Sequence, residues 1–280
     1  MTDTQVTPPS EAPAETRWWQ RVEVRGIFWL WLVFTVAGLA LSWAPAWLMG
    51  ISASVQMDEI KQTMTIFTAL SAPVAALIWA AMLYSILKWR HKGDEPPPDD
   101  GPGFRTNVPS VLAWTIASAI LVLFVFVWGL LKIASVPVAS AATDSNGVVS
   151  APMTVVVTGQ QWVWNFTYPG FGNIQSNELV LPIDKQTDFQ VSSTDVIHSF
   201  WIVEMGVKVD ANAGVITSTE VTPTRLGSYE VRCAELCGML HAAMETHARV
   251  VSEEEFKVWI AQKQAEANSQ IEPPAPEGAQ

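Results

Sequence analysis

The stretch Cys-Ala-Glu-Leu-Cys-Gly-Met-Leu-His-Ala-Ala-Met occupies positions 233–244 and holds both cysteines of this 280-residue chain. Two thiols (Cys233 and Cys237), an imidazole (His241) and a thioether (Met244) therefore lie within one short segment. Soft sulfur ligands with imidazole suit copper, whereas hard cations prefer carboxylate and carbonyl oxygens. The segment predicts a copper site, and the preceding part of the chain is expected to hold that site outside a membrane.

One further ligand is expected from His198, in Asp-Val-Ile-His-Ser-Phe-Trp at positions 195–201. The chain has only four histidines, and His91 lies beside a basic run far from the cysteines. A copper site that takes one histidine from an early strand and its other ligands from a late loop is the usual arrangement in cupredoxin sandwiches. These positions therefore favour a β-sandwich for the C-terminal part.

Three other interpretations of the cysteine stretch remain open. Cys233 and Cys237 could form a disulfide, which an exported domain permits. The cysteines and histidines could instead close a tetrahedral zinc site, although thioether ligation by Met244 is typical of copper and counts against zinc. The segment could also be one stripe of a buried helix, but Gly238 in its middle makes a loop the better prediction.

The chain resembles a known family over these residues. The pattern Cys-x-Glu-x-Cys-x-x-x-His-x-x-Met, with an upstream His-Ser-Phe-Trp at 198–201 and Gly-Val-Lys-Val-Asp-Ala at 206–211, is similar to the CuA domain of cytochrome c oxidase subunit II. The resemblance extends from about Thr154 to Trp259 and includes Gly-Gln-Gln-Trp-Val-Trp at 159–164. Hydrophobic segments before the domain also fit this family.

The resemblance implies a mixed-valence dinuclear copper centre. The sulfurs of Cys233 and Cys237 would bridge the two ions, and no coordination position would stay open. A closed site of this kind favours electron transfer over bond chemistry, because catalytic metals keep a position free for substrate. The implied ligands are His198 and Met244 on one copper, and His241 with the backbone carbonyl of Glu235 on the other.

The resemblance also implies partners. Trp162 would be the exposed tryptophan through which electrons arrive from cytochrome c, and subunit I of a haem-copper oxidase would receive them. Alternating Trp and Val residues at 162–164 could equally be core positions of a strand. By resemblance, the side chain of Glu235 and the neighbouring Asp210 would help to hold magnesium at the boundary with subunit I. Solvated carboxylates are the alternative.

Composition indicates a membrane protein, since 49% of residues are hydrophobic, 14 are tryptophan and the mean hydropathy is +0.22. A bilayer crossing needs about 20 apolar residues, and three runs reach this length: 27–49, 64–87 and 108–131. The first run follows several arginines and could be a signal peptide, but the apolar core of a signal spans only about 7–15 residues. We favour a retained helix. Cleavage near 51–53 stays open, because the family usually shows two helices.

Charged residues predict orientation and surface character. Basic residues precede the first run and follow the second, which places both ends in the cytoplasm and the cysteine stretch on the outer side of the cell membrane. From Ser135 onward, 17 acidic and seven basic residues give this part ten of the eleven net negative charges. An acidic surface steers a basic partner and is not expected to bind nucleic acid, while plain solubility is the other interpretation. The basic residues are Arg17, Arg21, Arg25, Lys88, Arg90 and Lys92.

These observations predict an α+β membrane protein with two or three transmembrane helices in the lipid bilayer, then an all-β cupredoxin-like sandwich and a short C-terminal helix. Residues 1–26 and 268–280 are expected to be disordered, residues 27–134 to form the membrane region, and residues 135–267 the extracytoplasmic copper domain. Ser252 and the glutamates after it would cap the last helix. Short β-rich runs predict strands at 154–158, 161–168, 178–181, 189–193, 199–203, 215–221, 229–232 and 247–251.

The predicted function is that of the haem-copper oxidase subunit that takes electrons from cytochrome c and passes them to the haem of subunit I, where oxygen is reduced to water and protons are translocated. One departure from the family pattern bears on it. The common oxidases have a Glu three residues before Trp-Thr, serving a proton pathway, and here Val111 stands before Trp114. A nitric oxide reductase with the same copper subunit is the alternative. A membrane-tethered copper carrier is disfavoured by the closed ligand set, and quinol oxidase subunits lack these ligands.

Overall fold

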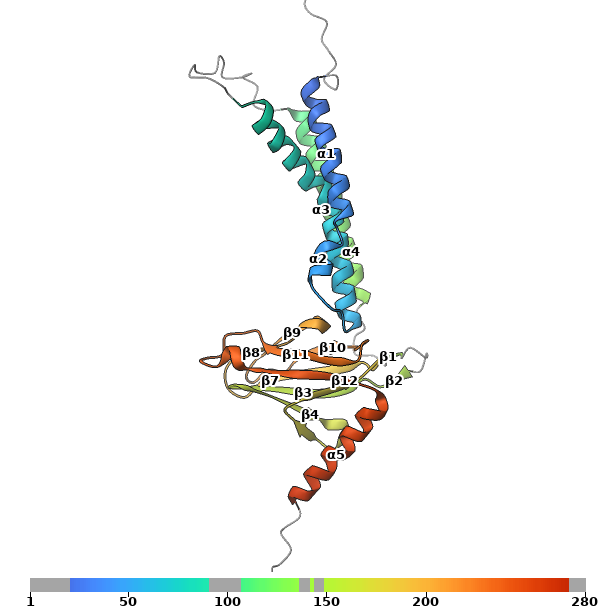
Figure 1. The fold of residues 1–280 in the computed structure, drawn as a ribbon, viewed down its shortest axis with the longest axis vertical. Helices are drawn as coiled ribbons and strands as arrows, with labels where there is room; N and C mark the ends of the chain where they lie inside the picture. Colours follow the sequence, from blue (N-terminus) through green and yellow to red (C-terminus); the bar gives the residue numbers. More distant parts are fainter. Residues whose placement is uncertain (1–20, 91–106, 136–141, 144–148, 272–280) are drawn as a thin grey trace, which may run out of the picture. The chain divides into compact units, whose positions relative to one another are not determined.

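The computed structural model describes residues 21–90, 107–135, 142–143 and 149–271 (Figure 1). The chain divides into two compact units, one comprising residues 1–48 with 63–100 and the other comprising residues 49–62 with 101–280. Disorder is predicted for residues 1–26 and 268–280, and of these, residues 1–20 and 272–280 lie outside the described residues.

In the part of the chain that the structure describes, three stretches of helix are long and apolar enough to cross a membrane, which confirms the three predicted runs. α1 (Val22–Ala40) and the short α2 (Ala44–Leu48) share the first stretch, α3 (Val55–Lys88) forms the second, and α4 (Val108–Ser135) forms the third. Uncharged apolar runs of this length suit helices, because a helix satisfies its own backbone hydrogen bonds without water.

The predicted disorder of residues 1–26 is wrong for its last residues, since α1 begins at Val22. Glu23 lies in the first turn of the helix, where the partial positive charge of a helix N-terminus favours an acidic side chain. Val22 and Val24 also prolong the apolar run toward the N-terminus. The helix therefore extends past the uncharged run that hydropathy detects.

α3 also begins earlier than the predicted residue 64. The hydroxyl of Ser54 accepts a hydrogen bond of 3.0 Å from the backbone N–H of Met57, which caps the helix, and donates one of 2.6 Å to the backbone carbonyl of Met205. Ser54 is fully buried. Residues 49–62 therefore pack with the sandwich, and not with the membrane region in which the prediction placed them.

Within the first unit, α1 packs closely against α3. The indole N–H of Trp31 donates a hydrogen bond of 2.8 Å to the backbone carbonyl of Pro73. A β-carbon added at Gly38 would lie 2.9 Å from the β-carbon of Ala72, which is closer than such atoms approach. Glycine at position 38 therefore lets the two helices meet, as small residues do between membrane helices.

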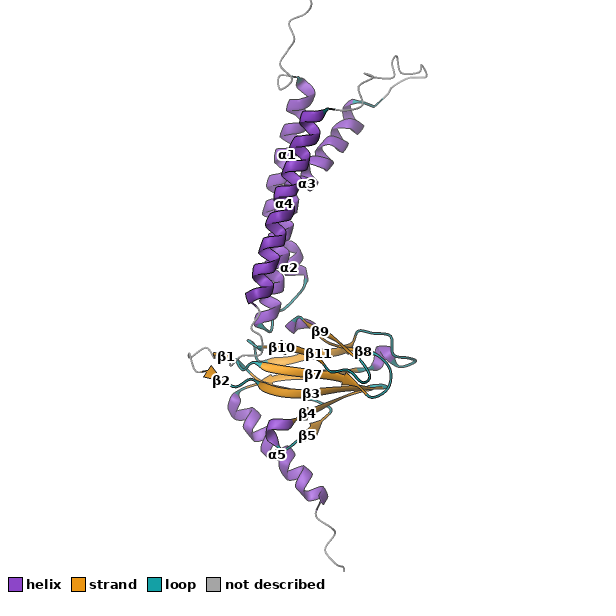
Figure 2. Cartoon of the chain, turned by 180° about the vertical axis from the view of Figure 1, so that it is seen from behind, coloured by secondary structure: helices purple, strands orange, loops and turns teal. Residues whose placement is uncertain are grey.

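The second unit contains a sandwich of two five-stranded sheets (Figure 2), which confirms the predicted architecture. One sheet has the strand order β10-β7-β3-β4-β5 and the other β6-β12-β11-β8-β9. Neighbouring strands are antiparallel except β3 with β7 and β6 with β12, which are parallel. β1 and β2 form a separate ribbon. The strands are β1 (Ala142–Thr143), β2 (Val149–Ser150), β3 (Met153–Gln160), β4 (Val163–Tyr168), β5 (Ile174–Ser176), β6 (Leu179–Pro182), β7 (Thr187–Ser193), β8 (His198–Ile202), β9 (Val207–Ala211), β10 (Thr217–Val221), β11 (Gly227–Cys233) and β12 (Glu245–Val251).

The core lies between the two sheets and follows from alternation along the strands. β3 buries every second residue over most of its length, as a strand with one covered face does. The ring centroid of Phe200 in β8 lies 5.5, 6.1 and 5.3 Å from those of three aromatic residues of the facing sheet, Trp164, Phe166 and Phe189. Edge-to-face aromatic contacts of this kind hold the two sheets in alignment.

Every predicted strand is present, as β3, β4, β6, β7, β8, β10, β11 and β12. The sequence analysis missed β1, β2, β5 and β9. β5 has only three residues, too few to show a period. β9 reads Val-Lys-Val-Asp-Ala, an alternation that is typical of a strand, and pairs with β8 along its whole length.

The C-terminal helix α5 (Glu253–Ile271) begins after Ser252, as predicted. The N–H of Ser252 donates to the carboxylate of Glu255 at 3.0 Å, and the N–H of Glu255 donates to the hydroxyl of Ser252 at 3.2 Å. This reciprocal capping box fixes the helix start. The helix runs past the predicted boundary at residue 267, because residues 253–272 contain no proline or glycine. Its buried residues pack toward β5 and β6 and are Phe256, Trp259 and Ile260.

Tyr168 of β4 joins the two sheets through a buried pair of hydrogen bonds. Its hydroxyl donates to the backbone carbonyl of Val180 at 3.1 Å and accepts from the N–H of the same residue at 2.8 Å. Val180 lies in β6 of the other sheet, and both side chains are fully buried. Burial raises the pKa of Tyr168 above its ordinary value of 10.0.

We expect Tyr168→Phe to lower the free energy of unfolding by about 1–3 kcal/mol, because both backbone groups of Val180 lose a partner while buried. The wild-type chain should also lose stability as pH rises above about 10. The unfolded tyrosine releases its proton there and the folded one keeps it, so alkaline conditions favour the unfolded state.

Urea unfolding of the full chain in detergent, from about pH 8 to pH 11, measures both effects. Tyr229→Phe is the control, because that hydroxyl donates only within its own turn, to the carbonyls of Arg225 and Leu226. Tyr168→Phe should show the shallower alkaline decline. Superimposable curves for wild type and Tyr168→Phe at both ends of the range would contradict the assignment.

Candidate metal centre

The cysteine stretch forms the connection between β11 and β12. Cys233 is the last residue of β11, and Met244 immediately precedes β12. The backbone N–H of Cys233 donates a hydrogen bond of 3.0 Å to the carbonyl of Met244, which closes the loop at its base. The interpretation as a helical stripe is wrong, because the loop contains one 3-10 turn, η4 (His241–Ala243), and no α-helix.

His198 reaches this loop through sheet pairing. It is the first residue of β8, in which Phe200 pairs with Cys233 of β11. The backbone N–H of Ala234 adds a hydrogen bond of 2.9 Å to the carbonyl of Ser199. The pairing places a histidine from an earlier strand beside the later loop, as the sequence predicts.

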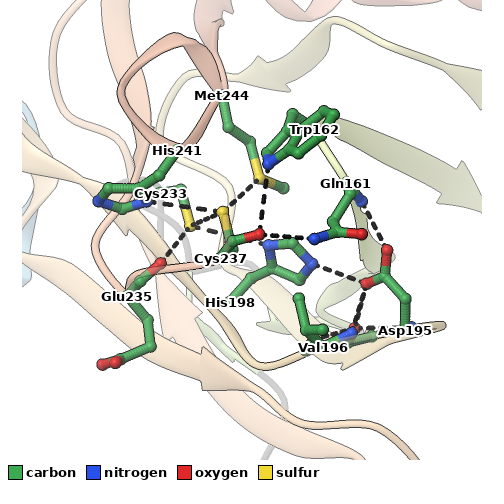
Figure 3. Close-up of polar contacts among 11 residues, drawn as sticks. Gln161, Trp162, Asp195, Val196, His198, Cys233, Glu235, Cys237, His241 and Met244 are labelled. Atoms are coloured by element: carbon green, nitrogen blue, oxygen red, sulfur yellow. Dashed lines mark hydrogen bonds and ion pairs between the residues drawn. The ribbon is translucent and has the colours of Figure 1, made fainter. Parts of the chain in front are cut away.

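The side chains converge on a pair of sulfur atoms (Figure 3). The Sγ atoms of Cys233 and Cys237 lie 3.8 Å apart. Nδ1 of His198 lies 3.8 Å from Sγ of Cys233, and Nδ1 of His241 lies 3.5 Å from Sγ of Cys237. The two imidazoles therefore approach different sulfur atoms.

Met244 and the backbone of Glu235 complete the group. Sδ of Met244 lies 3.8 Å from Sγ of Cys237, and the carbonyl oxygen of Glu235 lies 3.2 Å from Sγ of Cys233. His198 and Met244 are almost fully buried, whereas His241 is half-buried. The structure thus brings all the predicted copper ligands together at one end of the sandwich.

Both cysteines are free thiols, so the disulfide interpretation is not supported. Their sulfur atoms lie 3.8 Å apart, whereas a disulfide bond measures about 2.05 Å. Burial, together with the neighbouring Cys233, raises the pKa of the Cys237 thiol to about 11. A buried thiol pair of this kind ionises only beside compensating positive charge, which a metal ion supplies.

The donor set fits copper. The ligand atoms of His198, Cys233 and Cys237 lie within 4.8 Å of one another, which is close enough to share metal ions. Thiolate, thioether and imidazole are the ligands that copper accepts together, while the thioether of Met244 has no equivalent in the usual zinc sites.

Asp195 orients His198, a contact that the sequence analysis missed. Nε2 of His198 lies 2.8 Å from Oδ1 of Asp195, which leaves Nδ1 facing the sulfur atoms. Burial would raise the pKa of Asp195, but hydrogen bonds, first among them one from the backbone N–H of Gln161, outweigh it and lower the pKa from 3.8 to about 2. An ionised carboxylate fixes both the tautomer and the ring orientation. The Asp-x-x-His spacing is the signal that indicates such a contact.

Trp162 lies in the turn between β3 and β4, and its indole N–H donates a hydrogen bond of 3.3 Å to the backbone carbonyl of Cys237. Trp162 is half-buried at the margin of the core, whereas Trp164 is only 1% exposed. Trp164 is thus a core residue, whereas both interpretations stay open for Trp162, which packs against the core while partly exposed. The side-chain amide of Gln161 donates to the same carbonyl at 2.8 Å, a second contact that the sequence analysis missed.

The carboxylates of Glu235 and Asp210 are both exposed. In Figure 3 the Glu235 side chain points away from the sulfur atoms, while its backbone carbonyl faces Cys233. Across the described ranges, the one group of three or more His, Cys, Asp or Glu side chains whose ligand atoms all lie within 4.8 Å of one another is His198, Cys233 and Cys237, so neither Glu235 nor Asp210 belongs to such a group. Magnesium at Glu235 and Asp210 therefore stays a prediction.

Comparison with known proteins relates the chain to one protein family. The family described as "Cytochrome C oxidase subunit II, periplasmic domain" matches residues 175–251. The chain is 29% identical over 265 residues to cytochrome c oxidase subunit 2 of Thermostichus vulcanus, covering 79% of this chain and 80% of that relative. It is 26% identical over 240 residues to a probable cytochrome c oxidase subunit 2 of Rickettsia bellii, covering 78% and 84%.

Among solved structures, the chain is 30% identical to the periplasmic domain of subunit II of cytochrome oxidase of Bradyrhizobium japonicum, covering 45% of this chain and 98% of that chain with a TM-score of 0.40. The family match at 175–251 includes His198 and the whole cysteine loop. Helices able to cross a membrane precede the matched domain. The chain is therefore a homologue of cytochrome c oxidase subunit 2 over most of its length, a multi-pass membrane protein with a candidate copper site in its extracytoplasmic domain.

Proposed function

We propose that this chain accepts electrons from cytochrome c at a dinuclear CuA centre and passes them to the haem of subunit I, in an oxidase that reduces oxygen to water and translocates protons. The observation that supports this most directly is the convergence of soft donors on the buried sulfurs of Cys233 and Cys237, 3.8 Å apart. The curated relatives named cytochrome c oxidase subunit 2 support the same role.

The proposed ligands divide into two sets around the bridging cysteines. His198 and Met244 would hold one copper, and His241 with the carbonyl of Glu235 would hold the other. When bound, the copper pair supplies a one-electron site whose geometry changes little on reduction. The residues hold this geometry themselves, because His198 and Met244 are almost fully buried and Asp195 fixes the imidazole of His198.

Trp162 offers a route from the surface to the sulfur atoms. Its indole is partly exposed, and its N–H contacts the backbone carbonyl of Cys237, a residue whose sulfur would bridge the copper ions. The acidic surface of the domain would attract a basic cytochrome before contact. We assign docking to the surface charge and transfer to Trp162.

We further propose that the exposed carboxylates of Glu235 and Asp210 contribute to a magnesium site shared with subunit I. Both are exposed, as a site shared between subunits requires. The backbone of Glu235 contacts Cys233 while its side chain points outward, so one residue connects the copper loop to that boundary.

A second candidate function is electron donation to a nitric oxide reductase. Val111 supports this alternative, because it stands where the common oxidases carry a glutamate for proton uptake, and the first turn of α4 contains no acidic residue. Nitric oxide reduction needs the same copper site without the same proton routes.

The dicopper proposal predicts different results for two sulfur ligands. Cys237→Ser should abolish the electron spin shared between two coppers, because a hydroxyl is a hard, poor bridge. Met244→Leu should keep two coppers and shift the reduction potential, because a weak axial ligand tunes a site more than it holds the metal. Metal analysis and electron paramagnetic resonance of the full chain measure the copper content and the shared spin, and a redox titration measures the reduction potential. A single-copper hyperfine pattern in the wild type would contradict the dicopper assignment, as would a wild-type chain that binds zinc but not copper.

The proposed role of Trp162 predicts that Trp162→Phe slows transfer without weakening docking. The ring stays apolar and no charge is lost, but the N–H contact with Cys237 is removed. Association should still fall steeply with ionic strength, since the Debye length contracts from roughly 30 Å at 0.01 M to 10 Å at 0.1 M. Stopped-flow reduction by cytochrome c measures both steps, with Trp201→Phe on β8 as the control. Unchanged transfer in a copper-loaded Trp162→Phe chain would leave Trp162 without this role.

The terminal acceptor is tested in the native complex purified through this chain. We expect reduced cytochrome c to drive oxygen consumption, with protons released outside when the complex lies in vesicles. An oxygen electrode and a nitric oxide electrode distinguish the two candidates. Consumption of nitric oxide with no turnover of oxygen would favour the reductase and agree with Val111.

A further inference from the structure

The turn between β3 and β4 contacts both halves of the metal site without supplying a ligand. The backbone N–H of Gln161 donates a hydrogen bond of 2.7 Å to Oδ2 of Asp195. The other oxygen of this carboxylate, Oδ1, lies 2.8 Å from Nε2 of His198. One residue of the turn therefore holds the carboxylate that orients the histidine ligand.

The same residue also holds the cysteine loop. The side-chain amide of Gln161 donates to the carbonyl of Cys237 at 2.8 Å, and the indole of Trp162 donates to that carbonyl at 3.3 Å (Figure 3). Two donors on one carbonyl fix the peptide from which the Cys237 sulfur projects.

Gly238 keeps the space that this contact needs. Its φ of +118° is one that other residues rarely adopt, and a β-carbon at this position would lie 2.9 Å from Nε2 of Gln161. The loop backbone is thus shaped to receive the amide. The cysteine loop and the turn meet at Gln161.

We propose that Gln161 is a positioning residue of the copper site, which fixes the cysteine loop and His198 relative to each other. The proposal rests on the proposed copper site. The backbone N–H of Gln161 acts on His198 through Asp195, and the side chain of Gln161 acts on Cys237. The histidine and the cysteine loop are therefore fixed relative to each other before metal binds. Groups that orient metal ligands in this way typically contribute a factor of about 10–100 in metal affinity.

The polarity of the contact has a second consequence. The amide N–H of Gln161 points its positive end at the carbonyl of a residue that holds the copper, and hydrogen bonds near a copper thiolate tune its potential. Donors of this kind favour the reduced, more electron-rich form. Removing the amide donor of Gln161 lowers the reduction potential of the copper site, and a carboxylate at position 161 lowers it further.

The test compares wild type, Gln161→Met, Gln161→Glu and Gln160→Met as full chains in detergent, each titrated with copper alone. Gln161→Met keeps the length and the backbone N–H but loses the side-chain donor. Gln160→Met is the matched control, because Gln160 is the exposed neighbouring residue at the end of β3. Thiolate-to-copper absorption, bound copper and reduction potential are measured, and tryptophan fluorescence reports folding without copper.

We expect Gln161→Met to fold without copper, to bind copper about 10–100-fold more weakly, and to show altered thiolate absorption with a lower potential. Gln161→Glu should have a lower potential still, and Gln160→Met should match wild type. If Gln161→Met and wild type have equal copper affinity and equal reduction potential, the positioning role of Gln161 is overturned while the proposed copper site stands. Failure of Gln161→Met to fold without copper would also overturn it, because the contact would then support the fold. A wild-type chain that takes up no copper would instead overturn the proposed function and this role with it.

Discussion

The buried thiol pair sets the constraint that the rest of the domain must satisfy. Two sulfur atoms lie 3.8 Å apart at sites that are 8% and 3% exposed, and burial raises the pKa of the Cys237 thiol. Only a bound cation makes two thiolates stable in such a place. The loop must therefore present its donors to metal while keeping its own buried backbone groups paired. Those two requirements account for most of the contacts around it.

The sandwich meets this constraint by joining three segments far apart in sequence. β8 supplies His198, the connection from β11 to β12 supplies the sulfur ligands, and the turn after β3 pairs the carbonyl of Cys237. Phe200 connects the site to the core, because it pairs with Cys233 on one side and packs against Trp164 of the facing sheet on the other. A change in sheet alignment would thus move the ligands.

Sequence reasoning predicted the parts of this arrangement that depend on side-chain chemistry. The soft donors of the loop and His198 identify the site, and alternating apolar residues identify most strands. Sequence reasoning did not predict hydrogen bonds between side chains and backbone atoms, such as that of Gln161 with Cys237 or the cap that Ser54 provides for α3. The contacts of Asp195 could be predicted only in part. Its spacing from His198 is visible, but its second partner, the N–H of Gln161, comes from another strand connection.

The contacts that sequence reasoning missed are hydrogen bonds that hold the cysteine loop and His198 without any metal-ligand bond among them. A carbonyl such as that of Cys237 would need a partner in any fold, so its hydrogen bonds cost the domain nothing beyond ordinary pairing. Because the partners are side chains of a short turn anchored between β3 and β4, the loop cannot relax without disturbing the sheet. Under the proposed function, a site held in this way would change little when an electron arrives, because the protein and not the metal would set the positions of the donors. The same rigidity would serve copper binding and electron transfer together.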